Sequence, residues 1–305
     1  MVTNQVHVVF MGSPDFAVPV LEALAGNYPL VGVVTQPDRP AGRGGKPRPP
    51  AVKKSAVQLQ IPYIQPEKLR LPETMNQLHA WKPDLIIVAA FGQILRQEVF
   101  DMAHYGCINV HGSLLPRWRG AAPIQAAILA GDVQTGITIM KMDSGVDTGP
   151  ILSQHAYAIS PLDTGGSLFD KLSRLGADLL LETLPRYLSG ELIPLSQPEE
   201  GATYAPRLAR EDGRLDFTRS AIELERRVRA YFPWPGTWMD WKGTPLKISH
   251  AHVSEVDSPG IGLRLTIEAN PAVATSAGIL ILDEVQPSGK KVMSGKAFLI
   301  GARDW

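Results

Sequence analysis

The sequence predicts an α/β protein in which a mostly parallel sheet is followed by a smaller β domain. Two patterns and the chain length support this prediction. Up to Leu188, short continuous apolar runs alternate with helical periodicity, which is typical of a parallel sheet covered on both faces. Beyond Tyr204, short alternating segments are spaced by Gly and Pro, as in a small barrel or sandwich. A chain of 305 residues is long enough for about two domains.

The elements of the first part follow from periodicity. The apolar run Val6 to Met11 precedes a Gly-Ser-Pro-Asp loop and a helical pattern through Leu24, which predicts strand, loop and helix. Apolar positions at helical spacing predict one long helix from Thr164 to Leu188. The other predicted strands are 30–35, 85–90, 107–111 and 137–142, and the other predicted helices are 50–60, 72–81 and 122–130.

The second part begins after a segment with little periodicity. We therefore place a first domain at 1–189, a linker at 190–206 and a second domain at 207–305. Ser220 with Glu223 forms a capping-box signature, which predicts a helix up to Tyr231. The predicted strands of this domain are 238–241, 246–253, 263–268 and 278–285.

Composition excludes several classes of protein. Lys and Arg together number 30, as do Asp and Glu, and 44 % of residues are hydrophobic, which is ordinary for a globular protein. No apolar stretch approaches the roughly 20 residues of a membrane span. The single cysteine, Cys107, excludes an internal disulfide and a Cys-based zinc site. Without a basic leader or transit-peptide pattern, we expect a cytoplasmic protein.

The charge is distributed unevenly. Residues 39–54 contain six basic and no acidic side chains, so the rest of the chain is slightly acidic. Eight Gly and Pro residues between 37 and 50 exclude a helix or central strand there. The segment is either a solvated loop or a local contact for an anion such as a phosphate backbone. It is not a P-loop, because positions 40 and 47 are proline.

Asn109 and His111 carry the densest chemical signal. They alternate with apolar residues in the predicted strand 107–111, so their side chains project to the same face. Gly112 follows at once, which places them at the carboxyl end of the strand, where open α/β sheets bind ligands. An amide beside an imidazole suits a developing oxyanion. The alternative is an edge strand whose polar residues face water.

Asp143 and Asp147 lie in a glycine-rich turn after the predicted strand 137–142. They either cap that turn or supply a carboxylate that orients His111. The strands that end at Met142 and at His111 can be neighbours, which would bring these groups together. We expect no metal, because the close pair His250 and His252 lacks the other ligands of a metal site. The first strand is not followed by Gly-x-Gly-x-x-Gly, which disfavours a dinucleotide-dependent dehydrogenase.

These residues match a known family over essentially the whole chain: the sequence resembles the methionyl-tRNA formyltransferases. The Asn-x-His-x-Ser-Leu-Leu-Pro run and the Asp-Thr-Gly turn are typical of folate-dependent formyl transfer. The basic segment and the second domain narrow the resemblance to the tRNA-dependent members. The matching segments are 11–17, 35–38, 90–95, 109–116, 119–124, 143–150, 202–206 and 232–236.

The resemblance implies a Rossmann-like catalytic domain, an OB-like barrel that assists tRNA binding, and transfer of the formyl group of 10-formyltetrahydrofolate to the amino group of methionyl initiator tRNA. It implies a bacterial cytoplasmic monomer, an organellar form being the alternative. The catalytic set carried over is Asn109, His111 and Asp147. The folate-binding residues carried over are Phe91, Gly92, Ile94, Ser113, Leu114, Leu115 and Pro116.

The expected tRNA-binding residues are Arg39, Arg43, Lys46, Arg48 and Arg207. Family members often have Lys at the position of Arg207, so the charge is kept with a different contact geometry. The arginines at 226, 227 and 229 either extend this positive track or form a solvated helix face.

The chemistry expected of this set begins with attack of a neutral amine on the formyl carbon. The resulting tetrahedral intermediate carries a negative oxygen, which Asn109 and a cationic His111 beside Asp147 would stabilise. Collapse requires protonation of the folate nitrogen, by His111 or an ordered water. Cys107 shares the face of His111 but is expected to be a packed residue and not a nucleophile. The competing hypotheses are a formyltransferase for a small amine and a non-catalytic folate- or tRNA-binding protein.

Overall fold

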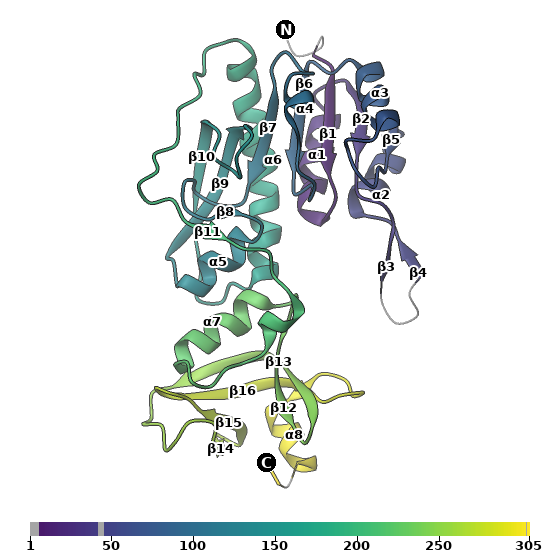
Figure 1. Cartoon of the computed structure of the whole chain (residues 1–305). Helices are drawn as coiled ribbons and strands as arrows, with labels where there is room; N and C mark the ends of the chain where they lie inside the picture. Colours follow the sequence, from purple (N-terminus) through teal and green to yellow (C-terminus); the bar gives the residue numbers. More distant parts are fainter. Residues whose placement is uncertain (1–5, 42–45, 303) are drawn as a thin grey trace. The chain divides into compact units, whose positions relative to one another are not determined.

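The computed structural model describes residues 6–41, 46–302 and 304–305 (Figure 1). The chain divides into two compact units, which we describe separately. Unit 1 comprises residues up to Gly120, Gln134–Ala158 and Phe169–Tyr204, and unit 2 comprises Ala121–Val133, Ile159–Leu168 and Ala205–Trp305.

Unit 1 is built on a seven-stranded sheet with the order β10-β9-β7-β6-β1-β2-β5. The five strands from β7 to β5 are parallel, whereas β9 is antiparallel to β7 and β10 is antiparallel to β9. The strands are β1 (Val8–Gly12), β2 (Leu30–Val34), β5 (Tyr63–Ile64), β6 (Leu85–Ala89), β7 (Cys107–His111), β9 (Gln134–Lys141) and β10 (Ile151–Ala158).

The central strands are continuous apolar runs because both of their faces are covered. Every residue of β1, β6 and β7 is buried. On β2, a Cβ at Gly32 would lie 2.5 Å from the Trp81 ring, so only glycine allows this close approach. The helices of this part of the chain are α1 (Val18–Ala25), α2 (Ala51–Gln58), α3 (Pro72–Trp81), α4 (Gln97–Phe100) and α6 (Gly165–Leu188), with a 3₁₀ turn η2 at Asp15–Ala17.

A two-stranded ribbon formed by β3 (Arg39–Ala41) and β4 (Lys46–Arg48) stands apart from the main sheet. A second short pair joins β8 (Arg119–Gly120) to β11 (Tyr204–Ala205). The prolines of this segment correctly predicted that it forms no central strand. They gave no indication of this antiparallel pairing, in which Arg39 lies opposite Arg48.

Unit 2 contains an antiparallel sheet with the order β12-β13-β16-β15-β14, and β17 pairs with β16. The sheet curls, so that the Arg264 side chain donates to the Asp240 carbonyl oxygen at 3.4 Å and thereby links β14 with β12. The strands are β12 (Thr237–Trp241), β13 (Thr244–Ser254), β14 (Arg264–Ile267), β15 (Asn270–Ala274), β16 (Ile279–Gln286) and β17 (Met293–Ser294).

Helices cover the core of unit 2. Its helical elements are α5 (Pro123–Ala130), η3 (Arg210–Gly213), α7 (Ala221–Tyr231) and α8 (Gly295–Gly301). The apolar face of α7 packs Leu224 and Val228 against strand residues such as Leu246 and Leu280. The expected cap is present, since the Ser220 hydroxyl accepts from the Glu223 N–H.

The predicted fold class is confirmed: a mostly parallel α/β sheet and an antiparallel β domain. Strand β10, strand β15 and helix α8 were not predicted. Only one of the eight residues of β10 is buried, so this strand lacks the buried apolar run that identified the other strands of this sheet. The five residues of β15 are buried but begin with Asn270 and Pro271, a pair typical of a loop.

Candidate functional site

The face of β7 that carries Asn109 and His111 is set by packing on its other side. Gly176 of α6 lies so close to Val110 that a Cβ there would stand 2.8 Å from the valine Cγ1. Val110 therefore points to α6, and the alternate residues Asn109 and His111 project from the opposite face, 8 % and 6 % exposed. The prediction that both side chains share a face at the carboxyl end of this strand is confirmed.

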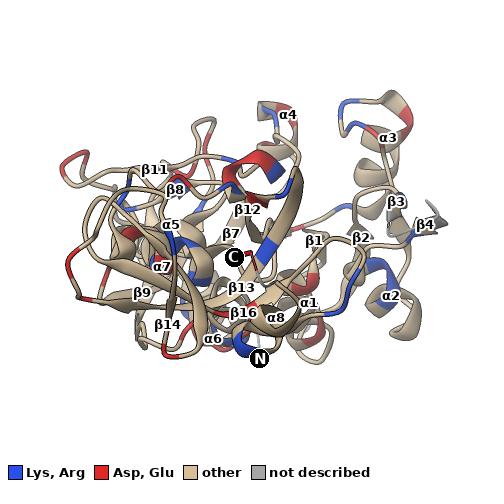
Figure 2. Ribbon diagram, turned by 90° about the horizontal axis from the view of Figure 1, so that it is seen from below, with Lys and Arg blue, Asp and Glu red and all other residues tan. Residues whose placement is uncertain are grey.

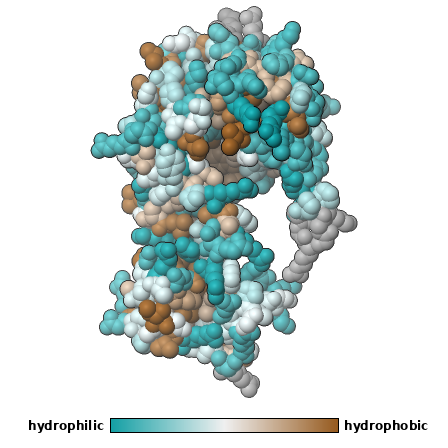
Figure 3. All heavy atoms as spheres, viewed as in Figure 1, coloured by the Kyte–Doolittle hydropathy of each residue, from teal (hydrophilic) through white to brown (hydrophobic). Residues whose placement is uncertain are grey.

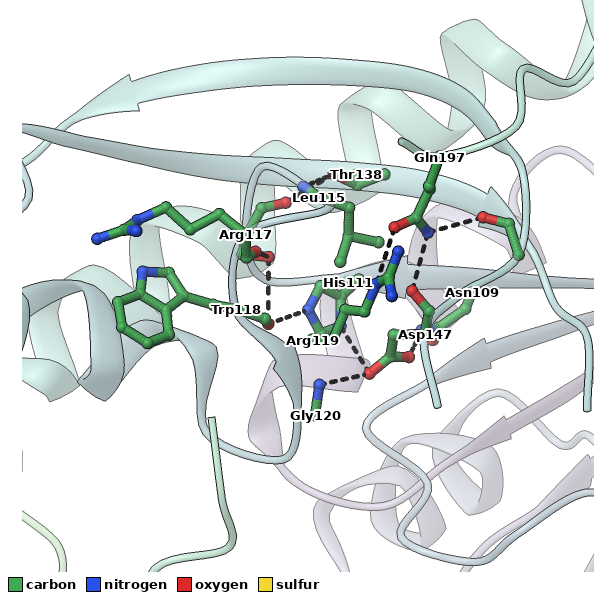
Figure 4. A network of polar contacts seen from close by, with 12 residues as sticks. Asn109, His111, Leu115, Arg117, Trp118, Arg119, Gly120, Thr138, Asp147 and Gln197 are labelled. Atoms are coloured by element: carbon green, nitrogen blue, oxygen red, sulfur yellow. Dashed lines mark hydrogen bonds and ion pairs between the residues drawn. The ribbon is translucent and has the colours of Figure 1, made fainter. Parts of the chain in front are cut away.

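Asp147 joins these two residues through the loop between β9 and β10. The Asn109 Nδ2 donates to Oδ1 of Asp147 at 3.3 Å, and the Gly120 N–H donates to Oδ2 at 2.8 Å. The same Oδ2 lies 3.6 Å from Nδ1 of His111 (Figure 4). Both carboxylate oxygens are thus engaged by groups that surround the imidazole.

The three groups come together by a different route from the one expected. Strands β7 and β9 are neighbours, but they are antiparallel, and Ile108 lies opposite Lys141. The carboxyl end of β9 therefore lies beside the amino end of β7, away from His111. The loop after β9 runs back toward the carboxyl end of β7. Near the end of this loop, Asp147 takes a left-handed backbone conformation (φ 52°), which is uncommon for a residue other than glycine.

The other nitrogen of His111 is also fixed. Its Nε2 lies 2.9 Å from the carbonyl oxygen of Trp118, a residue with φ 62°. A carbonyl and a carboxylate are both acceptors, so only an imidazole with a proton on each nitrogen can donate toward both. Both ring nitrogens of His111 therefore face acceptors.

The segment from Ser113 to Arg117 is held from below. The Thr138 hydroxyl donates to the Ser113 carbonyl oxygen at 2.7 Å and accepts from the Leu115 N–H at 3.1 Å. The Gln154 side-chain amide donates to the Leu115 carbonyl oxygen at 2.8 Å. The Ser113 hydroxyl, fully buried, donates to the Arg117 carbonyl oxygen at 2.6 Å. Ser113 therefore supports the loop through its side chain.

The remaining expected folate residues divide by exposure. Phe91 and Leu115 are 2 % and 3 % exposed, whereas Ile94 is 89 % exposed. The Phe91 carbonyl oxygen already accepts from the Gln36 side-chain amide at 3.1 Å. The register of Val88 with Asn109 places the segment after β6 beside the end of β7. The space-filling view shows hydrophobic residues around a hollow in unit 1 (Figure 3).

The expected tRNA-binding residues show different environments. Arg39 pairs with Glu67 at 2.8 Å, and Arg48 on β4 and Arg207 are exposed. Figure 2 shows further basic positions on helix α2, which follows β4 in the chain. Arg43 lies outside the described residues, and for Lys46 only the backbone is described, in β4. These observations leave the roles of the five residues as a prediction.

Two arginines of α7, Arg227 and Arg229, make hydrogen bonds within unit 2. The Arg227 guanidinium donates to the Asp212 carbonyl oxygen at 2.8 Å. Arg229 pairs with Glu225 and also donates to the Asp163 carbonyl oxygen at 2.9 Å. Arg227 and Arg229 thus tie α7 to other segments of unit 2, and the part of this helix in a positive track stays a prediction.

Cys107 is placed as expected for a packed residue. Its side chain is fully buried, and burial raises the pKa of the thiol to about 12. A thiol in this state is not a nucleophile at neutral pH.

His250 and His252 each face a carboxylate, Glu284 and Asp283 respectively, at 2.9 Å. Across the described part of the chain, no group of three or more His, Cys, Asp and Glu side chains is arranged to hold a metal ion. Within that same part, no helix has the length and apolar character needed to cross a bilayer.

Sequence reasoning missed two side chains of the site. Gln197 donates to the carbonyl oxygens of Asp147 and Gly149, at 2.8 and 2.7 Å, from the segment interpreted as a linker. Arg119, 1 % exposed, donates to the Gln197 side-chain oxygen at 3.2 Å. Arg119 belongs to a matched segment, but Gln197 stands in an aperiodic stretch that carries no local signal.

Both parts of the chain match known protein families. Residues 5–184 match the Formyl transferase family, and residues 207–303 match the Formyl transferase C-terminal domain. The chain is 47 % identical to methionyl-tRNA formyltransferase of Myxococcus xanthus over 97 % of this chain and 95 % of that protein. It is 48 % identical to the enzyme of the same name from Bacillus pumilus, over 97 % and 95 % of the two chains.

Solved structures share the fold. Methionyl-tRNA formyltransferase from Clostridium thermocellum superimposes with a TM-score of 0.59 at 16 % identity, over 95 % of this chain and all of that one. An N-formyltransferase from Helicobacter canadensis, solved with folinic acid and dTDP-3-aminofucose, gives a TM-score of 0.66 at 19 % identity, over 91 % and 99 % of the chains. At these identities the likeness concerns the fold alone.

Proposed function

The chain belongs to the methionyl-tRNA formyltransferase family, and from that premise we propose that it transfers the formyl group of 10-formyltetrahydrofolate to the α-amino group of methionyl initiator tRNA through Asn109, His111 and Asp147. The observation that carries the residue assignment is one carboxylate, Asp147, engaged at once by the Asn109 amide, the Gly120 N–H and the His111 ring. Formyl transfer is the family's reaction in translation initiation, and its formyl donor is folate-derived.

Asn109 provides a donor for the oxygen that becomes negative when an amine attacks the formyl carbon. Its side-chain amide has two hydrogens, and one of them points to Asp147. The other is available for that oxygen. Removing one such donor typically lowers the rate by about 10² to 10³.

His111 supplies positive charge and a proton. Asp147 balances the charge of the imidazolium, and the Trp118 carbonyl oxygen fixes the ring orientation. The attacking amine must be neutral. A free α-amino group has a pKa of about 8, so a modest base is enough to remove its proton. The attacking amine releases a proton when its new C–N bond forms, and the donor nitrogen takes up a proton when its bond to the formyl carbon breaks; His111 or a water that it orders carries this proton from one nitrogen to the other.

The residues after β6 and β7 fit a flat ligand with polar edges. Gly92 has φ 79°, and among the described residues a Cβ there would have only the Gln36 amide nitrogen within 4 Å, at 3.7 Å, so the backbone is open on this side. Exposed Ile94 adds an apolar surface. The residues that would hold the folate are Phe91, Gly92, Ile94, Ser113, Leu114, Leu115 and Pro116, with Ser113 and Leu115 acting through the loop backbone.

The tRNA contacts in this proposal are Arg39, Arg43, Lys46, Arg48 and Arg207, as salt-sensitive phosphate contacts. The catalytic domain is 1–189, the linker 190–206 and the tRNA-assisting domain 207–305. The enzyme works as a monomer in the cytoplasm, and light scattering of the purified protein tests the monomer.

A comparison of acceptors tests the proposed function. The wild-type protein is incubated with 10-formyltetrahydrofolate and, in parallel, methionyl initiator tRNA, an amino-sugar nucleotide and glycinamide ribonucleotide. We expect the largest kcat/KM with the charged tRNA. Transfer to the small amines only would retain the catalytic set and refute the tRNA assignment, and folate binding without transfer would identify a binding protein.

A further inference from the structure

Residues 195–204, which we call the strap, contact both loops that form the site. Leu195 and Ile151 exchange backbone hydrogen bonds of 2.7 and 2.8 Å. At the other end, Thr203 accepts from the Trp118 N–H through its hydroxyl at 2.9 Å and from the Arg119 N–H through its carbonyl at 2.8 Å. The strap therefore binds the loop that carries the acceptor of His111 as well as the start of β10.

Gln197 lies at the centre of the strap with its side-chain amide fully used. Both hydrogens of Nε2 go to backbone carbonyl oxygens, those of Asp147 and Gly149. The amide oxygen accepts from Nε of Arg119. The orientation of the amide is thereby determined, because a flipped amide would set its oxygen against two carbonyls and its NH₂ against a guanidinium.

Arg119 is in turn locked in place. Its guanidinium is buried and contacts the Glu199 carboxylate at 3.3 Å and the Tyr204 hydroxyl at 3.4 Å, both from the strap. A buried charge persists where partners satisfy it, and here three strap side chains do so. Figure 4 shows hydrogen bonds from Arg119 to Gln197 and from Gln197 to Asp147, beside His111.

We propose that Gln197, oriented by Arg119, is a positioning residue that holds the Asp147 turn so that its carboxylate meets Asn109 and His111. The turn needs such support because Asp147 itself has the left-handed conformation, which an L-residue leaves readily when nothing restrains it. The two bonds from Gln197 fix the carbonyls at residues 147 and 149, one on each side of Thr148. This inference rests on the role proposed for Asp147.

The test uses an isosteric change. Gln197→Glu keeps the size and the contact with Arg119 but replaces the two N–H donors by an oxygen that faces two carbonyl oxygens. We expect kcat to fall about 10²-fold, the effect of a misplacement near 1 Å. The KM values for donor and tRNA should stay near those of the wild type, because Gln197 contacts neither in this proposal. Gln58→Glu, an exposed residue of α2 with the same charge change, should be unaffected in kcat.

A double-mutant cycle separates positioning from a general structural role. Gln197→Ala is measured alone and combined with Asp147→Ala, in single turnovers with enzyme in excess. If Gln197 acts through Asp147, its removal lowers the wild-type rate strongly and the Asp147→Ala rate little. Equal losses in both backgrounds, or a wild-type kcat for Gln197→Glu, would overturn the inference.

Two further results keep the test decisive. If Gln197→Ala does not fold, Arg119→Lys replaces it in the cycle, since lysine keeps the charge and cannot bridge Gln197, Glu199 and Tyr204 at once. If Asp147→Ala alone has wild-type activity, the proposed role of Asp147 fails, which is a different result from a failure of coupling.

Discussion

Oδ2 of Asp147 lies 3.6 Å from Nδ1 of His111, although β9, the strand before Asp147, ends beside the start of β7 and His111 is at the other end of β7. The loop between β9 and β10 spans that separation, and the left-handed backbone at Asp147 turns the carboxylate toward the ring. The site therefore depends on loop geometry as much as on the strand that carries Asn109 and His111.

Arg48 should affect tRNA use and its dependence on salt. Replacing Arg48 by Ala removes one exposed charge from β4, and each lost phosphate contact lowers the slope of log affinity against log salt by about 0.7 to 0.9. We expect a higher KM for methionyl-tRNA and an unchanged kcat, measured over a series of salt concentrations. Arg174→Ala, at an exposed arginine of α6 outside the proposed tRNA contacts, is the control and should leave the slope unchanged. Identical salt slopes for wild type and Arg48→Ala would remove Arg48 from the tRNA surface.

Cys107 should be inert in the folded protein. Because burial raises its pKa to about 12, iodoacetamide should not label it at neutral pH until urea unfolds the chain. The folded pKa lies above the ordinary value of 9.0, so the native state holds the proton more tightly and the free energy of unfolding falls as pH rises above 9. Urea midpoints of wild type and Cys107→Ala at increasing pH check this, and a steeper loss in the variant would contradict it.

Ser220 should stabilise unit 2 through the start of α7. Ser220→Ala removes the acceptor for the Glu223 N–H, and loss of such a cap lowers stability by about 1 kcal/mol. The hydrogen bonds from Ser220 also lower the pKa of Glu223. The contribution of that carboxylate is present above its ordinary pKa and is lost as pH falls through the lowered one.

Urea unfolding at neutral and acidic pH measures both effects. Ser288→Ala, an exposed serine of unit 2, is the matched control. An equal midpoint for Ser220→Ala and Ser288→Ala would show that the cap contributes nothing.

The sequence was sufficient for the parts of the site that obey a periodic rule. Alternation in residues 107–111 predicted that Asn109 and His111 share a face, and the Gly112 that follows predicted the sheet edge. The capping box at Ser220 was equally local, since its two partners are three residues apart. In each case short-range geometry alone determines the outcome.

The rest depended on contacts between distant segments. Asp147 was selected by resemblance. The expectation that the ends of β7 and β9 lie together was wrong, since β9 is antiparallel to β7. An apolar run does not distinguish an antiparallel strand from a parallel one. Gln197 contacts a turn 50 residues earlier in the chain, and Arg119 contacts Glu199 80 residues away. Such pairings follow from the tertiary fold and leave no periodic signal.

The most direct test of the catalytic set is the single-turnover rate of formyl transfer from 10-formyltetrahydrofolate to methionyl initiator tRNA in Asn109→Ala, His111→Ala and their double variant. Each single substitution should lower the rate about 10² to 10³-fold. The double variant should lose far less than the product of the two, because residues that stabilise one charge act as a unit. A folded His111→Ala protein that transfers formyl at the wild-type rate would contradict the assignment.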